Sequence, residues 1–94
     1  MRVRWLRRAL RNLDEEAAYI ARDDRRAAAQ VVERIAASID LLATQPAVGR
    51  PGRVPGTREL IVPGTPYIVP YRVHDDTVEI LRVFHGGRKW PEKL

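Results

Sequence analysis

The stretch TRELIVPGTPYIVPYRVHDDTVEILRVFH, residues 57–85, decides the fold of this chain. It contains three runs rich in β-branched and aromatic residues, which is the composition typical of strands. Four residues with Pro and Gly separate the first two runs, and two aspartates separate the last two; both lengths suit hairpin turns. The stretch therefore predicts a three-stranded antiparallel meander with strands at 57–62, 67–74 and 77–84.

The turn lengths also predict the register of the strands, and with it the two faces of the sheet. The predicted pairs are Arg72 with Glu79, Ile68 with Val83, and Leu60 with Val69. One face, which we expect to pack on helices, carries Leu60, Val62, Tyr67, Val69, Tyr71, Val73, Val78, Ile80 and Phe84, with Arg58 and Arg82 as exceptions. The opposite face carries Glu59, Ile61, Ile68, Pro70, Arg72, Glu79, Leu81, Val83 and His85.

The first half of the chain changes from a strand pattern to a helix pattern. Residues 2–5 alternate polar and apolar side chains, which predicts a short strand. Two apolar stripes with spacings of three and four follow, as in amphipathic helices. Their members are Leu6, Leu10, Leu13, Ala17 and Ile20, then Ala28, Val32, Ile35, Ile39 and Leu42. Asp23 and Asp24 separate the stripes, so residues 6–44 are expected to form an antiparallel helix hairpin.

The segments that remain are a loop and a tail. Residues 45–56 are expected to form a loop, because Pro or Gly occupies six of the eleven positions from 46 to 56. Residues 86–94 form the tail. A chain of 94 residues supports one core, so residues 1–94 are expected to be a single α+β domain. The expected order is β-α-α-β-β-β, with the helix hairpin on one face of a small antiparallel sheet and residues 1–5 as a strand joining its edge.

The composition excludes several classes of function. There is no cysteine and there are only two histidines, so we expect no disulfide, no metal site and no cofactor. The apolar runs are too short to cross a membrane, and the N-terminal sequence lacks the apolar segment of a signal peptide. We therefore expect a cytoplasmic protein with no membrane contact. The net charge of +5 favours a nucleic acid or an acidic protein surface as partner.

The second sheet face is too apolar to be left to solvent once the helices cover the first, and it predicts a partner surface. Its candidate contact residues are Ile61, Ile68, Leu81 and Val83, together with Arg72. Arg72 lies opposite Glu79 in the predicted register, so a cross-strand ion pair is expected there. Ser38 is the only serine and has no histidine expected near it, which argues against a serine-based catalytic triad.

The stretch RVFHGGRKWP, residues 82–91, holds the other candidate residues. These are His85, Arg88, Lys89 and Trp90. His85 could transfer protons while Arg88 holds a phosphate, a combination compatible with RNA cleavage. The alternative is that all four side chains form a docking tip for a macromolecular target. Trp90 could contact that partner or anchor the tail to the core of its own chain.

The order of elements, with PGTRELIVPGTPYIVPYRV and VEILRVFHGGRKWP in the sheet, resembles the RelE/ParE superfamily of toxins from bacterial type II toxin–antitoxin modules. The resemblance covers nearly the whole chain. It implies a small cytoplasmic toxin that a cognate antitoxin neutralises by draping a helix and an extended segment over it. The antitoxin contacts expected on this chain are Ile61, Ile68, Arg72, Leu81 and Val83. The target contacts are His85, Arg88, Lys89 and Trp90.

The superfamily divides by target, and three positions here distinguish the branches. RelE-like members cut messenger RNA on the ribosome, whereas ParE-like members inhibit DNA gyrase. Where RelE-type ribonucleases carry two lysines and an arginine, this chain has Glu59, Ile61 and Ile68, which cannot stabilise the charge on a scissile phosphate. The resemblance therefore favours a ParE-like gyrase inhibitor with no catalytic residue. The alternatives are a messenger RNA endonuclease that uses His85 and Arg88, and a degenerate, non-toxic antitoxin-binding module.

Overall fold

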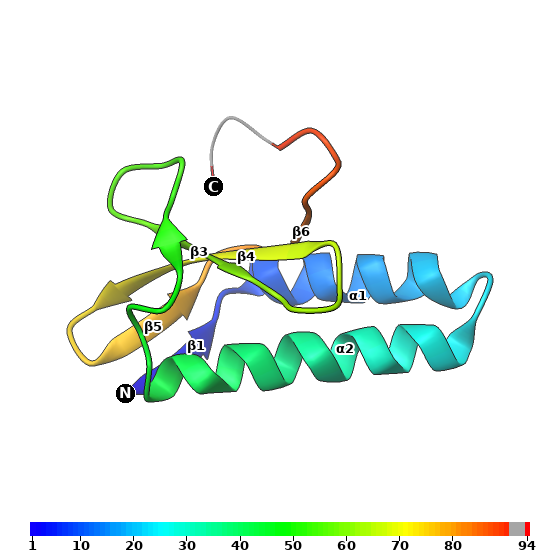
Figure 1. Ribbon diagram of the computed structural model, residues 1–94, viewed down its shortest axis with the longest axis horizontal. Helices are drawn as coiled ribbons and strands as arrows, with labels where there is room; N and C mark the ends of the chain where they lie inside the picture. Colours follow the sequence, from blue (N-terminus) through cyan, green and yellow to red (C-terminus); the bar gives the residue numbers. More distant parts are fainter. Residues whose placement is uncertain (91–93) are drawn as a thin grey trace.

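The computed structural model describes residues 1–90 and residue 94, so residues 91–93 of the predicted tail lie outside the described residues. Two helices pack on one face of a six-stranded sheet, and the loop after β2 and the C-terminal segment lie on the other face (Figure 1). The α+β class is thus confirmed. The elements are β1 (Arg2–Trp5), α1 (Arg7–Ala21), α2 (Arg25–Asp40), a short 3-10 helix (Leu41–Ala43), β2 (Arg50–Pro51), β3 (Arg58–Ile61), β4 (Tyr67–His74), β5 (Thr77–Ile80) and β6 (Phe84–His85).

The sheet is mixed, because its first strand runs parallel to its neighbour. The strand order is β1-β5-β4-β3-β2, with β6 also paired to β4. β1 lies at an edge, as expected, and pairs in parallel with β5 from Arg2 opposite Thr77 to Trp5 opposite Ile80. The other pairs are antiparallel. The predicted loop also contributes a strand, since Arg50 pairs with Glu59.

The predicted register holds at both turns and then shifts by one residue. Arg72 pairs with Glu79 and Leu60 with Val69, as predicted. Ile68, however, pairs with Phe84 instead of Val83. Since side chains alternate between faces, a shift of one residue moves every later side chain to the opposite face. The predicted faces of Val83, Phe84 and His85 were therefore wrong.

Pro70 explains the shift. The N–H of Leu81 donates to the carbonyl of Pro70 at 3.0 Å, so the backbone polar groups of Pro70 face β5. Proline has no N–H to complete this pair, and in a central strand it is found at bulges. The chain consequently leaves the ladder after Ile80 and returns at β6 with one extra residue. Val83 turns inward, 2% exposed, and its N–H donates to Asn12 of α1.

Both helices bury one stripe against the sheet, as their spacing predicted. The Asp24 side chain caps α2 by accepting a hydrogen bond from the N–H of Ala27 at 3.0 Å. In α1 the buried stripe differs by one position from the prediction, because Ala9 is fully buried whereas Leu10 is 48% exposed. The buried core consists of Ala9, Ile35, Ile39, Leu42, Leu60, Val62, Tyr67, Val69, Tyr71, Val78, Ile80 and Val83. In the described residues, no helix is both long and apolar enough to cross a membrane.

Tyr71 ties the loop after the helices to the middle of the core. Its ring is fully buried, and burial raises the pKa of its hydroxyl. The hydroxyl donates to the carbonyl of Pro46 at 2.7 Å and accepts from the N–H of Gly49 at 2.9 Å. A Cβ atom at Gly49 would lie 2.6 Å from the Tyr71 hydroxyl, so glycine is needed for this close approach.

Replacing Tyr71 by Phe is expected to lower the free energy of unfolding by about 1–3 kcal/mol, because the Gly49 N–H and Pro46 carbonyl lose their common partner in a buried place. Urea denaturation followed by circular dichroism measures the change. Tyr19→Phe is the matched control, since Tyr19 is 57% exposed and should change stability by less than about 0.5 kcal/mol. Equal stability of the two variants would contradict this role of Tyr71.

Candidate binding surfaces

One end of the outer sheet face carries a ladder of ionic side chains. The Nε of Arg72 donates to Glu79 at 2.7 Å, and Arg4 on β1 lies 3.6 Å from the same carboxylate. The hydrogen bond from Arg72 is the main cause that lowers the pKa of Glu79. The predicted cross-strand pair is therefore confirmed. Arg72 stays about half exposed, so it remains accessible as a predicted partner contact.

The centre of this face is covered by the chain itself. Leu81 is only 7% exposed and lines a cavity of about 510 Å³ whose other walls include Val54, Pro55 and Leu94. The expectation that this face is left open was wrong at its centre. Among the predicted antitoxin contacts, Ile61 is exposed and Ile68 half-buried, whereas Leu81 and Val83 are buried.

Glu59, on β3, is the buried charge of the outer face, with 2% of the residue exposed. Its carboxylate accepts from Arg50 Nε at 3.1 Å, from Arg50 Nη2 at 2.9 Å, and from the backbone N–H of Arg53 at 2.9 Å. A buried carboxylate is retained only when it is paired and hydrogen-bonded in this way. Glu59 therefore fastens the loop that follows β2 to the sheet.

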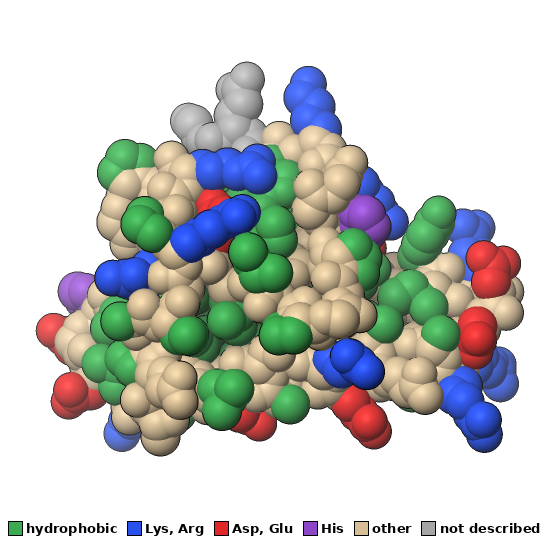
Figure 2. Space-filling view, viewed as in Figure 1, with side chains coloured by type: hydrophobic (Ala, Val, Ile, Leu, Met, Phe, Trp, Pro, Cys, Tyr) green, Lys and Arg blue, Asp and Glu red, His purple; other side chains and the backbone are tan. Residues whose placement is uncertain are grey.

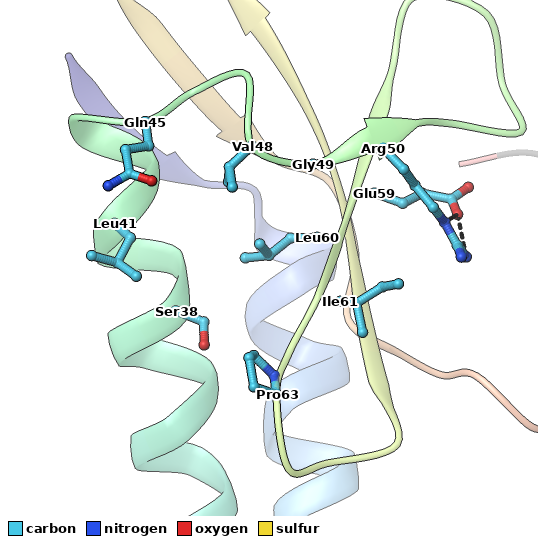
Figure 3. Close-up of a pocket in the computed structure, with 10 residues that line it drawn as sticks. All are labelled: Ser38, Leu41, Gln45, Val48, Gly49, Arg50, Glu59, Leu60, Ile61 and Pro63. Carbon is cyan, nitrogen blue, oxygen red and sulfur yellow. Dashed lines mark hydrogen bonds and ion pairs between the residues drawn. The ribbon is translucent and has the colours of Figure 1, made fainter.

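An apolar groove of about 320 Å³ lies between the end of α2, the loop before β2, and β3 (Figure 3). Three of its apolar side chains are unusually exposed: Leu41 (57%), Val48 (56%) and Ile61 (51%). The remaining lining residues are Ser38, Gln45, Gly49, Arg50, Glu59, Leu60 and Pro63. The space-filling view shows several hydrophobic side chains exposed on this face of the molecule (Figure 2).

The groove is also bordered by a free strand edge. Within residues 1–90, β2 pairs with β3 only at Arg58 and Glu59, so no described strand lies beside Ile61 on that side. Since the Val62 N–H donates to Tyr67, alternation along the strand turns the backbone groups of Ile61 away from β4, toward this edge. A partner segment entering the groove would therefore meet both apolar side chains and backbone hydrogen-bonding groups.

At the other end of the sheet, Arg88 is bound to the first helix. Its Nη1 lies 3.0 Å and 2.8 Å from the two carboxylate oxygens of Glu16, and its guanidinium lies 5.0 Å from the centre of the Tyr19 ring. The Tyr67 hydroxyl donates to the same carboxylate at 3.0 Å. Burial first, and then this hydrogen bond, raises the pKa of Tyr67 to about 12.

His85 lies beside this cluster, and its ring makes an edge contact with Tyr67 at 5.6 Å between centroids. The N–H of Gly87 donates to His85 Nδ1 at 3.1 Å, so in the neutral ring the proton resides on Nε2. The Nε2–H of a neutral His85 can therefore donate a hydrogen bond, whereas Nδ1 can take up a proton only if the bond from Gly87 is lost. Lys89 is exposed next to this turn.

Trp90 packs back onto the chain. Its ring lies 4.8 Å from Phe84, and the Arg53 guanidinium covers it at 3.8 Å from the ring centroid. The sequence left open whether Trp90 anchors the tail or contacts a partner, and these contacts make it an anchor. In the described residues no three His, Asp or Glu side chains gather in a way that could hold a metal ion.

Sequence reasoning missed three features. The groove was missed because its walls come from a helix end, a loop and a strand, which no single periodicity joins. Glu16 ends the acidic run Asp14-Glu15-Glu16, and nothing in that run indicates that it receives Tyr67 and Arg88 from the far end of the chain. Arg53 lies in a segment rich in Pro and Gly, and no sequence pattern there indicates its contact with an aromatic ring. The one usable signal was Glu59, because an acidic residue in an apolar strand suggests a buried ion pair.

Comparison with known proteins assigns the family. Residues 3–90 match the family described as the ParE toxin of the type II toxin-antitoxin system parDE. The chain is 56% identical over 93 residues to "Putative toxin Y4kP" of Sinorhizobium fredii, covering 99% of this chain and 96% of that protein. It is 32% identical over 81 residues to toxin RelE1 of Caulobacter vibrioides, covering 84% and 86%.

A solved structure agrees in fold. A chain described as "Chromosomal ParDE TA system from P. aeruginosa" superposes with a TM-score of 0.80 at 30% identity, covering 90% of this chain and 95% of that one. The family match spans nearly the whole chain and the structural match includes both layers. This chain therefore belongs to the ParE family, within the RelE/ParE superfamily, and is the toxin of a type II toxin–antitoxin system.

Proposed function

We propose that this toxin arrests growth in the cytoplasm by inhibiting DNA gyrase, and that it does not cleave messenger RNA. The observation that carries the proposal is the pairing of Arg88 with Glu16 at 2.8 Å. A nuclease centre at His85 would need a cation that is free to neutralise the charge of the phosphate. The charge of Arg88 is already compensated by the carboxylate of Glu16. The resemblance adds that Glu59, Ile61 and Ile68 occupy positions where nuclease relatives carry cations.

The proposed target-docking surface is the turn that the last strand presents. His85, Arg88 and Lys89 surround the two glycines, and Trp90 holds the end of this turn on the sheet. Arginine, tyrosine and tryptophan are the residues most enriched at the energetic centres of protein interfaces. Tyr19, 57% exposed beside Arg88, belongs to the same surface.

The proposed antitoxin-docking surface is the apolar groove with Leu41, Val48 and Ile61. Apolar side chains exposed together mark a surface that a partner covers. The Arg50 side chain at its rim is already paired with Glu59 at 2.9 Å, so the proposed contacts in the groove are mainly apolar. This revises the predicted contact set: Ile61, Arg72 and the half-buried Ile68 remain in it, and the buried Leu81 and Val83 leave it.

Purified toxin is expected to inhibit supercoiling of relaxed plasmid by gyrase and to leave a reporter message intact on translating ribosomes. Addition of the cognate antitoxin should restore supercoiling. Cleaved message together with unaffected supercoiling would contradict the proposal and favour the ribonuclease alternative. Absence of both effects, with antitoxin binding retained, would favour a non-toxic binding module.

Replacing His85 by Ala is expected to raise the toxin concentration that half-inhibits gyrase by about fivefold at most, the size of one lost contact. Loss of a general acid or base would instead lower activity by about 100-fold or more. The same variant should bind the antitoxin as the wild type does. A loss of the larger size, with fold and antitoxin binding intact, would assign His85 a role in proton transfer.

Replacing Leu41 by Asp is expected to weaken antitoxin binding by about tenfold or more, because a charge would be buried in an apolar contact. Isothermal titration calorimetry measures the affinity, and gyrase inhibition should be unchanged. Val73→Asp is the matched control, since Val73 is 41% exposed but lies on β4, outside the groove. Equal affinity for the two variants would show that the antitoxin binds elsewhere.

A further inference from the structure

The C-terminal segment is held on the outer sheet face by a chain of three contacts. Glu59, buried in β3, accepts a hydrogen bond from the Arg53 N–H at 2.9 Å, and the Arg53 Nε lies 3.9 Å from the same carboxylate. The Arg53 guanidinium covers the Trp90 ring at 3.8 Å, and Trp90 in turn packs on Phe84 of β6. We name Glu59, Arg53 and Trp90 the latch.

We infer that Glu59 and Arg53 are positioning residues, which fix the C-terminal turn by clamping Trp90 against Phe84. Stacking is what holds the indole, because its Nε1 is buried and has no hydrogen-bond partner among the described residues. The ring therefore depends on the cation above it and the aromatic ring beside it. In the part of the chain that the structure describes, no hydrogen bond or ion pair joins Glu59 or Arg53 to the turn of His85 and Lys89, so each acts on the turn through Trp90.

The geometry of Arg53 depends on Glu59. The loop from Gly52 to Thr57 lies on the surface, closed by the Gly52 N–H donating to the Thr57 carbonyl at 2.8 Å. Only 3% of the Glu59 side chain is exposed, against 54% for Arg53, so the carboxylate is the fixed end of the pair. It holds both the backbone and the guanidinium of Arg53, and so sets where the cation lies above Trp90.

The latch also explains why an acidic residue is compatible with β3 in this toxin. Without a carboxylate between them, the guanidinium groups of Arg50 and Arg53 would repel each other. The Glu59 carboxylate compensates the charge of both. One carboxylate thus joins the strand β2, the loop after it and the C-terminal segment. Any effect of Glu59 and Arg53 on gyrase inhibition rests on the proposed function, because it requires that the C-terminal turn docks on gyrase.

The test follows the fluorescence of Trp90 in a Trp5→Phe background. The chain has two tryptophans, so Trp90 is the one that remains in this variant. Arg53→Ala is expected to shift its emission to longer wavelength and to raise the acrylamide quenching constant by about twofold, since an exposed cation–π contact is lost. Arg53→Lys keeps the charge but not the planar stack, and should give a smaller rise. Arg26→Ala, at an exposed arginine of α2, is the matched control and should change neither quantity.

Unchanged quenching in Arg53→Ala overturns the inference, whatever the protein does to gyrase. Glu59→Gln gives a second, independent variant, expected to raise quenching in the same direction while circular dichroism shows the fold intact. If the toxin inhibits gyrase, Arg53→Ala should also raise the half-inhibiting concentration by about two- to fivefold, with antitoxin affinity unchanged. If wild-type toxin leaves gyrase unaffected while quenching still rises, the latch stands and the proposed function fails.

Discussion

A single missing backbone N–H, that of Pro70, determines how this protein presents its C-terminal end. Pro70 accepts from Leu81 but cannot donate in return, so the third strand of the meander breaks after Ile80 and resumes one residue late. The break moves Val83 into the core and turns Phe84 to the outer face. Trp90 can pack on Phe84 only because of this reversal. The position of the whole terminal turn therefore depends on a proline in the middle of β4.

Among the described residues, three carboxylates each receive an arginine from another element of the fold. Glu16 on α1 receives Arg88, Glu59 on β3 receives Arg50 and Arg53, and Glu79 on β5 receives Arg4 and Arg72. The arginines in these pairs therefore cross-link strands, loop and tail. This arrangement is consistent with a protein as the target.

Sequence patterns predicted what local geometry determines. The apolar spacing from Ala28 to Leu42 predicted α2, and the Asp75-Asp76 turn predicted the pairing of Arg72 with Glu79. Sequence patterns failed where a single residue changes which side chains face the core. The register beyond Pro70 needed knowledge of which way its backbone faces. In α1, Leu13 and Ile20 pack on the core as predicted, but Ala9 takes the buried place expected for Leu10. The groove and the Glu16 cluster join segments far apart in the chain, and no single stretch contains them.

The parallel pairing of β1 with β5 has a consequence for folding. The helix hairpin and the meander are built from contacts close in sequence, whereas Arg2 reaches Thr77 only across both of them. Contacts between distant segments close late and slow the folding of a small domain, since the loop entropy must be lost before the pairing is gained. Until β1 docks, the edge of β5 stays open to pairing with another chain. We therefore expect the first strand to pair late in folding, and the newly made chain to be most prone to aggregation before that pairing.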